Sequence, residues 1–143
     1  MTPKLKDALF RMGTALHTDV YRWTGGRVGG KAGRMPMLLL TTTGRKSGRP
    51  RTTPLGYLSD GERMVLVASY GGDDRHPQWY RNLQANPEAT VQVGAQARRV
   101  RAATATAEQK AELWPRVVAL YSGYGAYQRK TTRDIPLVIL TPA

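Results

Sequence analysis

Short runs of strand length, separated by turn residues, fill the chain from Pro36 to its end, and this pattern constrains the fold more than any other feature. The runs cover residues 37–43, 52–58, 63–69, 89–93, 98–104 and 135–140. Ser59-Asp60-Gly61-Glu62 joins the second run to the third, and its Asp-Gly pair is typical of a hairpin turn. Such strands, with two helices between them, predict an α+β domain built on a small, mainly antiparallel barrel.

The two helices within this region are indicated by their end signals. Residues 77–86 lie between Pro77, a favoured residue in a first helical turn, and Pro87, which a helix rarely passes. Thr106-Ala107-Glu108-Gln109 has the spacing of a capping box, so a second helix is predicted from there to Tyr121.

The first 34 residues have a different pattern. Apolar residues recur every three or four positions over residues 3–23, which predicts an amphipathic helix. This apolar stripe consists of Leu5, Leu9, Met12, Leu16, Val20 and Trp23. We expect the stripe to pack on the domain core. Contact with a membrane surface is the alternative, because basic flanks and a terminal Trp also suit a lipid headgroup layer.

Residues 24–34 follow this helix and contain five glycines, so they are predicted to be a flexible linker. The chain would then divide into residues 1–34, an N-terminal helix with its linker, and residues 35–143, the barrel domain. Because the linker separates the two parts, we expect the helix to be dispensable for ligand binding by the barrel.

Composition narrows the possible partners and chemistries. The net charge of +12 indicates an anionic partner: a nucleic acid, an acidic membrane surface or an acidic small molecule. The chain has no cysteine and only two histidines, which excludes thiolate chemistry and argues against a metal centre. It has neither a signal-peptide pattern nor an apolar run long enough to cross a membrane, so we expect a cytoplasmic protein.

A basic turn, residues 44–51, directly follows the strand predicted at 37–43. Four of its eight residues are cationic, and glycines stand at positions 44 and 48. Glycines let the backbone approach a ligand, while Arg45 and Arg51 each offer a planar fork of donors to phosphate or carboxylate. The spacing matches neither the Walker loop nor the Rossmann fingerprint. We interpret the turn as an anion cradle, with a charged, solvated hairpin loop as the alternative.

Three tyrosines, Tyr121, Tyr124 and Tyr127, recur at every third residue. On a helix this spacing would keep them near one face, but Gly123 and Gly125 each weaken a helix by about 1 kcal/mol relative to alanine. We therefore predict a mobile lid that carries aromatic side chains, with core tyrosines as the alternative.

A series of further motifs follows the glycine-rich segment. The first are Leu40-Thr41-Thr42-Thr43-Gly44-Arg45-Lys46-Ser47-Gly48, Pro50-Arg51 and Pro54-Leu55. The next are Val67-Ala68-Ser69, Gly71-Gly72, Pro77-Gln78-Trp79-Tyr80-Arg81-Asn82-Leu83, Ala85-Asn86-Pro87, Tyr121-Ser122-Gly123-Tyr124 and Arg133-Asp134-Ile135-Pro136. In this order they resemble the signature of the deazaflavin-dependent nitroreductase family.

The resemblance implies a split β-barrel of the flavin-reductase type that binds coenzyme F420, a deazaflavin with a phosphate and an oligoglutamate tail. Arg45, Lys46 and Arg51 match the positions that bind the tail and the phosphate. Ser47 and the amides around Gly44 and Gly48 would add neutral donors. The positions that match the family's ring-binding residues are Pro54, Ser69, Gly71, Gly72 and Trp79. For Trp79 the alternative is that it plugs the barrel together with Leu83.

The implied reaction is hydride transfer from reduced F420 to an electrophilic small molecule: a quinone, an unsaturated lactone or ketone, or a nitroaromatic. The Ser69 hydroxyl would donate a hydrogen bond near the reacting centre, and Tyr121, Tyr124 and Tyr127 would face the acceptor. Gly56 departs from the family, which has an aromatic residue after the Pro-Leu pair. We therefore expect an enlarged or reshaped acceptor pocket, which puts nitroimidazole reduction in doubt.

Two other interpretations stay open at this point. The same barrel could bind FMN instead of F420. The positive charge and the run Arg98-Arg99-Val100-Arg101 instead suggest a nucleic-acid-binding module, although no helix-turn-helix, zinc or RNP pattern is present.

Overall fold

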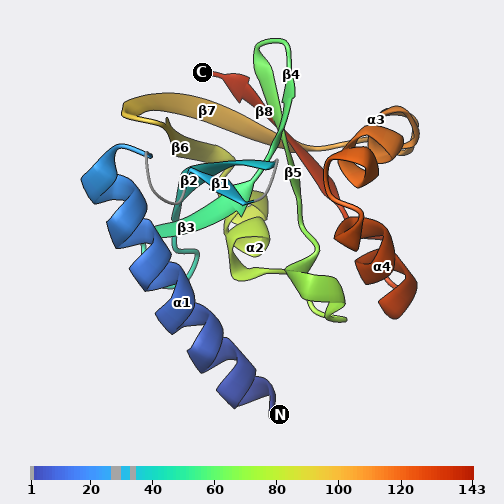
Figure 1. Ribbon diagram of the computed structural model, residues 1–143, viewed down its shortest axis with the longest axis horizontal. Helices are drawn as coiled ribbons and strands as arrows, with labels where there is room; N and C mark the ends of the chain where they lie inside the picture. The colour runs from blue at the N-terminus through green and yellow to red at the C-terminus, as the bar shows by residue number, and fades with distance from the viewer. Residues whose placement is uncertain (1, 27–29, 33–34) are drawn as a thin grey trace.

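Helices flank a curled antiparallel sheet in the computed structural model of the protein (Figure 1). The structure describes residues 2–26, 30–32 and 35–143. Its helices are α1 (Pro3–Thr24), α2 (Gln78–Ala85), α3 (Ala107–Leu120) and α4 (Gly123–Lys130), with a 3-10 turn, η1 (Tyr70–Gly72). Its strands are β1 (Lys31–Ala32), β2 (Met35–Thr43), β3 (Pro50–Gly56), β4 (Leu58–Asp60), β5 (Arg63–Val67), β6 (Glu88–Val93), β7 (Gln96–Thr104) and β8 (Leu137–Pro142).

The sheet order is β1-β2-β6-β7-β8-β5-β4, and β3 pairs with β2 outside this path. Each of these strand pairs is antiparallel. Strand β2 is the junction, because it pairs with β3 from Met37 to Thr43 and with β6 from Leu39 to Thr41. The predicted α+β fold with an antiparallel split barrel is confirmed.

Two apolar clusters form the core. One fills the barrel and includes Leu38, Leu40, Leu66, Trp79, Leu83, Val91, Val100 and Leu140. The other lies under α3 and α4 and includes Val65, Val67, Leu113, Val117, Tyr124 and Ile139. Because successive residues of a strand point to opposite faces, β5 and β8 contribute to both clusters. Burial on both faces explains why these two strands have continuous apolar sequences.

The predicted local elements are observed, with one strand divided in two. The 89–93 and 98–104 runs form the β6–β7 hairpin, and the capping box opens α3, with Gln109 N donating to Thr106 Oγ1 at 3.1 Å. The prediction of one continuous strand over 52–58 is wrong. The chain changes partner there, because β3 ends at Gly56 on β2 whereas β4 begins at Leu58 and pairs with β5.

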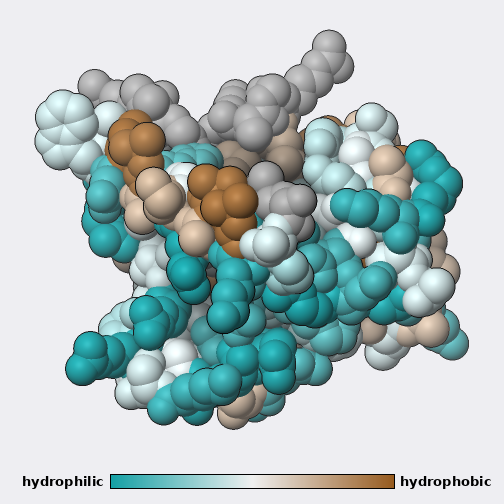
Figure 2. Space-filling model, turned by 90° about the horizontal axis from the view of Figure 1, so that it is seen from below, coloured by the Kyte–Doolittle hydropathy of each residue, from teal (hydrophilic) through white to brown (hydrophobic). Residues whose placement is uncertain are grey.

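Helix α1 confirms the predicted N-terminal helix, but its apolar stripe points away from the barrel. Leu5, Leu9, Met12, Leu16 and Trp23 are between 48% and 88% exposed, so the expectation that the stripe packs on the core is wrong. Hydrophobic side chains also stand out as brown patches on the mostly teal face in Figure 2. The barrel contact is made instead by Tyr21, which is 1% exposed. Its hydroxyl lies 3.0 Å from Met37 O and accepts from Gly94 N at 2.8 Å.

The predicted linker is described only in part. Gly25 ends α1 in the left-handed conformation, with φ of 62°, and Lys31–Ala32 form the short strand β1 on the end of β2. Residues 27–29 and 33–34 lie outside the described residues. The division of the chain at residue 34 stays a prediction.

Residues 123–130 form a regular helix, α4, although Gly123 and Gly125 favoured an irregular segment. Tertiary packing outweighs the propensity cost. Tyr124 is 8% exposed and belongs to the cluster under α3 and α4. On the side facing η1 the backbones approach closely, since a Cβ on Gly72 would lie 2.9 Å from Tyr127 O.

Candidate functional site

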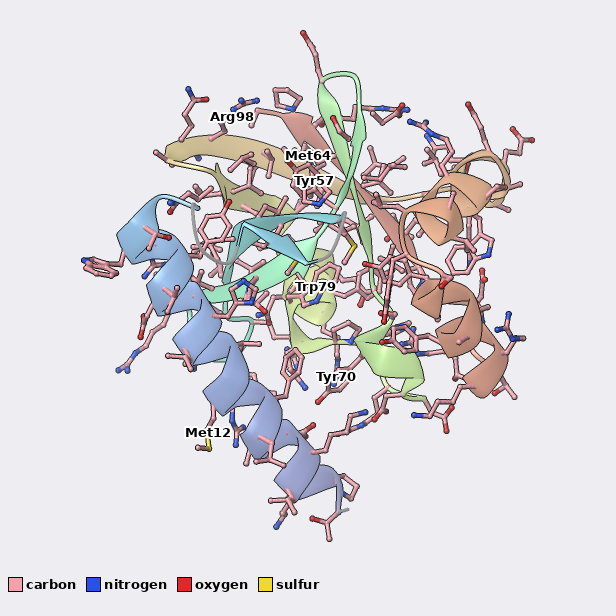
Figure 3. The ribbon with its side chains drawn as sticks, in the orientation of Figure 1. Met12, Tyr57, Met64, Tyr70, Trp79 and Arg98 are labelled. Carbon is pink, nitrogen blue, oxygen red and sulfur yellow. The ribbon has the colours of Figure 1, made fainter. Side chains whose placement is uncertain are left out.

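A cavity of about 690 Å³ lies between α1, the basic turn and α2, a size that suits a small-molecule ligand. The structure brings five of the predicted cofactor-binding residues together on its wall: Arg45, Lys46, Ser47, Arg51 and Trp79. Tyr70 also lines the cavity, and Figure 3 shows Tyr70 and Trp79 between α1 and α4. The part of α1 that faces the cavity was not predicted to belong to any site.

The basic turn is closed by its own backbone. Gly44 N donates to Arg49 O at 2.8 Å, and Gly48 N donates to Gly44 O at 2.8 Å. Gly48 has φ of 72°, and a Cβ on Gly44 would lie 2.7 Å from Ser47 Oγ, so both positions need glycine. Closing the turn therefore uses the amides of Gly44 and Gly48 themselves, and the expectation that the amides around them add neutral donors stays a prediction. Ser47 Oγ accepts from Arg49 N at 3.1 Å and retains its own proton for donation.

Asn82 of α2 fixes the guanidinium of Arg45. Its Oδ1 accepts from Arg45 Nη1 at 2.9 Å and from Arg45 N at 3.2 Å, while its Nδ2 donates to Thr42 Oγ1 at 3.2 Å. Gln78 Oε1 accepts from Arg45 Nη2 at 2.7 Å. The guanidinium is therefore held in place before any ligand arrives. Sequence reasoning gave Asn82 and Gln78 no role, although their i, i+4 spacing places two amides on one helix face.

The charge on the cavity wall is predominantly positive. Four cations line it, Arg11, Arg45, Lys46 and Arg51, against the carboxylates of Asp7 and Asp19. The Asp7 carboxylate is already engaged, because it accepts from the Tyr70 hydroxyl and from Arg75. These contacts lower the pKa of Asp7, the Tyr70 hydrogen bond most. The remaining field favours an anionic ligand.

Trp79 lies where both of the roles considered for it would place it. It is 7% exposed and belongs to the cluster inside the barrel, and it also lines the cavity. Pro54 is buried on β3 opposite Leu39 and is not among the described residues that line the cavity.

The predicted ring-binding residues Ser69, Gly71 and Gly72 flank Tyr70 in the turn around η1. Tyr70, Gly71 and Gly72 have φ values of 43°, 63° and 81°, and a non-glycine residue in this region is uncommon. The Tyr70 hydroxyl donates to Asp7 of α1. Burial and this hydrogen bond raise the pKa of Tyr70 to about 12.

Arg133, just before β8, braces this turn through backbone carbonyls. It donates from Nη2 to Ser69 O at 2.8 Å, from Nη1 to Ala68 O at 3.1 Å and from Nε to Asp73 O at 2.9 Å. Its Nη1 also lies 3.3 Å from His76 Nδ1. Burial, followed by the charges of Arg133 and Arg81, lowers the pKa of His76, so the neutral ring accepts this contact. Arg133 was part of the recognised motif, but its role was not predicted.

The three tyrosines form one cluster beside this turn. Their ring centroids are 5.1, 6.1 and 6.3 Å apart in edge-on pairs, and the hydroxyls of Tyr121 and Tyr127 are 3.2 Å apart. The Tyr124 hydroxyl contacts Met35 Sδ at 3.3 Å, and burial raises the pKa of Tyr124 to about 12. Tyr121 is 40% exposed, so the cluster extends from the core to the surface. None of the three lines the cavity in the described part of the chain.

Met35 fills the space beside Gly56. A Cβ on Gly56 would lie 2.4 Å from both Sδ and Cε of Met35. A side chain from the paired strand therefore occupies the space directly beside Gly56, and the enlarged or reshaped acceptor pocket stays a prediction.

Comparison with known proteins decides the family. The profile of the F420H(2)-dependent quinone reductase family matches residues 14–142. The chain belongs to this family. An F420H(2)-dependent quinone reductase of Mycobacterium tuberculosis H37Rv is 45% identical over 130 residues, which is 88% of this chain and 87% of the relative. The solved structure of the F420-H2 dependent reductase FDR-A is 40% identical, with a TM-score of 0.68, covering 73% of this chain and 93% of that one. A solved domain-swapped dimer is 35% identical, with a TM-score of 0.71, covering 88% and 94%.

The quinone reductase family is F420H2-dependent, so reduced coenzyme F420 is the hydride donor and the protein is an F420-dependent oxidoreductase. F420 is thus the cofactor, and not the FMN that the sequence left open. The cationic wall of the cavity fits its anionic phosphate and glutamate tail. The other basic run lies elsewhere: Arg98 is on β7, at the opposite end of the barrel from Tyr70 (Figure 3).

Two further properties of the described residues concern metals and membranes. Among these residues, no three His, Cys, Asp or Glu side chains are grouped as a metal site requires. No helix in the same part of the chain has the length and hydropathy to cross a membrane.

Proposed function

We propose that the enzyme transfers a hydride from reduced F420 to a quinone. The observation that carries this proposal is the cavity in which Arg45, Lys46 and Arg51 line the wall together with Trp79 and Tyr70. Cations suit the anionic tail, and aromatic side chains suit a flat ring system. The relatives described above carry the same activity in their names.

In this proposal the basic turn holds the tail. Arg45, fixed by Asn82, and Arg51 bind phosphate or carboxylate oxygens through their guanidinium groups, Lys46 adds a point charge, and Ser47 donates from its hydroxyl. Exposed charges of this kind are screened by salt, so affinity should fall as ionic strength rises.

The ring would lie against Trp79 and the turn that contains Ser69, Gly71 and Gly72. Reduced deazaflavin supplies the hydride, and the protein orients it and stabilises the negative charge that develops on the acceptor. The Ser69 hydroxyl is the proposed donor for that charge. Arg133 holds the carbonyl of the same residue, which fixes the backbone from which this hydroxyl projects.

The acceptor would bind on the side of the tyrosine cluster. Tyr121 and Tyr127 share a hydroxyl contact and can present a phenolic donor, whereas the more deeply buried Tyr124 completes the aromatic wall. An unsaturated lactone or ketone and a nitroaromatic are the other electrophiles of this class that such a wall could accept.

The test is steady-state oxidation of reduced F420 with a panel of acceptors: a water-soluble quinone, an unsaturated lactone, an enone and a nitroaromatic. We expect turnover with the quinone, and a rate lowered about ten- to thousand-fold by Tyr127→Phe or Tyr121→Phe while F420 affinity is kept. Turnover of the nitroaromatic but not of the quinone would contradict the proposed acceptor. Unchanged rates in both variants would show that neither tyrosine acts on the acceptor.

We further propose peripheral membrane contact through α1. Its apolar stripe is exposed, and Lys4 is an exposed cation on the same helix, a combination that suits an anionic lipid surface. Flotation with vesicles rich in an acidic phospholipid should carry the protein upward, and Met12→Glu with Leu16→Glu should abolish this. Equal flotation of the double variant would contradict the proposal. So would a wild-type protein that runs as a dimer through the stripe in size-exclusion chromatography and does not bind vesicles.

A further inference from the structure

Helix α1 turns a polar face toward the cofactor cavity. Asp7, Arg11, Thr14 and Thr18 line the cavity together with Phe10, Ala15 and Asp19, and the four named first, spaced four, three and four residues apart, lie on one side of the helix. A helix that merely covered the barrel would bury its apolar stripe instead. The inverted orientation indicates that a polar ligand belongs under α1.

Thr18 provides an independent sign of that ligand. It is 6% exposed, and its Oγ1 has no hydrogen-bond partner. Threonine hydroxyls in helices commonly bond a preceding carbonyl, as Thr14 does with Arg11 O at 3.1 Å and Thr24 with Val20 O at 2.7 Å. Thr18 makes no such bond, so its buried hydroxyl lacks a partner within the protein.

Thr53 of β3, the strand next to α1, repeats this observation. Its Oγ1 is also buried without a partner, and it lines the same cavity. Among the side chains of residues 2–26, 30 and 35–143, these two hydroxyls are the buried polar atoms that lack a partner. Their shared location makes a ligand between them the simplest explanation.

Contacts along its length hold α1 in this position. Near its start, Lys6 Nζ pairs with Asp73 Oδ2 at 2.8 Å, and Asp7 accepts from Tyr70 and Arg75. Phe10 adds an edge-on ring contact to Tyr70, with centroids 5.5 Å apart. Near the end of the helix, Tyr21 is anchored to the barrel backbone. The helix is thus fastened on both sides of Thr18.

We propose that α1 is a wall of the F420 site, and that Thr18 and Thr53 donate hydrogen bonds to anionic oxygens of the cofactor's phosphate or glutamate tail. Arg11 faces the same cavity as Arg45, Lys46 and Arg51, so the tail lies between cations of the helix and of the basic turn. This inference rests on the proposed function, because it assigns further residues to the same cofactor site.

The experiment is fluorescence titration of the full chain with F420, paired with thermal unfolding of the unbound protein. Thr18→Val keeps the shape and removes the hydroxyl. We expect it to weaken F420 binding about ten- to hundred-fold while the Tm stays equal or rises, since an unsatisfied buried hydroxyl is lost. Thr53→Val should behave alike. Thr24→Val is the matched control: its hydroxyl bonds within the helix, so we expect a lower Tm and unchanged affinity.

Two shortened ligands identify the partner atom. The deazaflavin fragment without phosphate and tail should bind wild type and Thr18→Val equally. With the form that has the phosphate but no glutamates, a retained loss assigns the hydroxyl to the phosphate, and an absent loss assigns it to a glutamate carboxylate. Unchanged F420 affinity in both valine variants, with normal binding by the wild type, would overturn the role of α1 alone. A wild type that binds no F420 would overturn the proposed function and this inference together.

Discussion

The barrel and helix α1 use apolar residues in opposite ways. In β5, Val65 and Leu66 are fully buried on opposite faces, one under α3 and one inside the barrel. In α1, Met12 and Leu16 are 69% and 68% exposed, while the polar Thr18 on the other face is buried. A periodic apolar stripe identifies two faces of a helix, but the surface beneath decides which face turns inward. The surface under α1 is a basic cavity, so the polar face of the helix turns toward it.

The largest expected effect is a difference in the free energy of unfolding between a variant of the barrel and a variant of α1. Leu66→Ala should lower the free energy of unfolding by about 2 to 5 kcal/mol, because it leaves a cavity in a closely packed core. Leu16→Ala should change it by about 0.5 kcal/mol or less, because the side chain is already in solvent. Urea unfolding measures both. Similar losses in the two variants would mean that the stripe is buried in solution.

The next effect concerns the polar side of the comparison. Arg45→Ala and Arg51→Ala should each weaken F420 binding by about 1 to 3 kcal/mol through the loss of charge-assisted contacts. Arg98→Ala is the control, since Arg98 is an exposed cation on β7 away from the cavity. Fluorescence titration at fixed salt gives the three affinities. An equal loss in all three would indicate a non-specific charge effect in place of a built site.

A third prediction concerns the turn that joins the two regions. Arg133→Met removes the donors to three carbonyls of residues 68–73 and should lower kcat about ten- to hundred-fold through misplacement of that turn, with a smaller change in KM. Arg133→Lys or added guanidinium ion should restore part of the rate. Arg129→Met, an exposed cation on α4, is the control. A lower Tm in Arg133→Met, with no recovery of kcat by Arg133→Lys or added guanidinium ion, would assign Arg133 a purely structural role.

The smallest effect is a pH dependence of the same turn. The pKa of His76 is lowered in the folded state, below the ordinary value of 6.5, so its contribution to stability is complete above that pH. The contribution should be lost as the pH falls through the folded-state pKa, because a protonated ring would face Arg133 and Arg81. The carboxylates of Asp73 and Asp74 favour the charged form of Arg133, but burial outweighs them and lowers the pKa of Arg133. The measurement is the free energy of unfolding of wild type and His76→Gln as the pH falls below 6.5. Identical pH profiles for the two proteins would contradict the prediction.

Much of the fold followed from local signals in the sequence. Strand-length runs, the Asp60-Gly61 turn and the Thr106 capping box each act over a few residues, and all are observed. The basic turn was found in the same way, because Arg45, Lys46, Ser47 and Arg51 are close in sequence. All four line one cavity, while their contacts with F420 stay a prediction.

The features that sequence reasoning missed depend on residues far apart in the chain. Asp7 meets Tyr70 across 63 positions, and Arg133 meets Ser69 across 64. The contact of the Met35 side chain with Gly56 likewise depends on the pairing of β2 with β3. No local pattern encodes such contacts. The sequence shows that α1 has an apolar and a polar face. It does not show which face turns inward, because that depends on the cavity under the helix.

The most direct test is equilibrium binding of F420 and FMN to the wild-type chain, followed by deazaflavin and flavin fluorescence at several salt concentrations. A cavity whose cationic wall recognises a phosphate and a glutamate tail predicts much tighter binding of F420, with an advantage that shrinks as salt rises. Equal affinity for the two cofactors, or an F420 affinity that does not respond to salt, would contradict the assignment of this cavity as the F420 site.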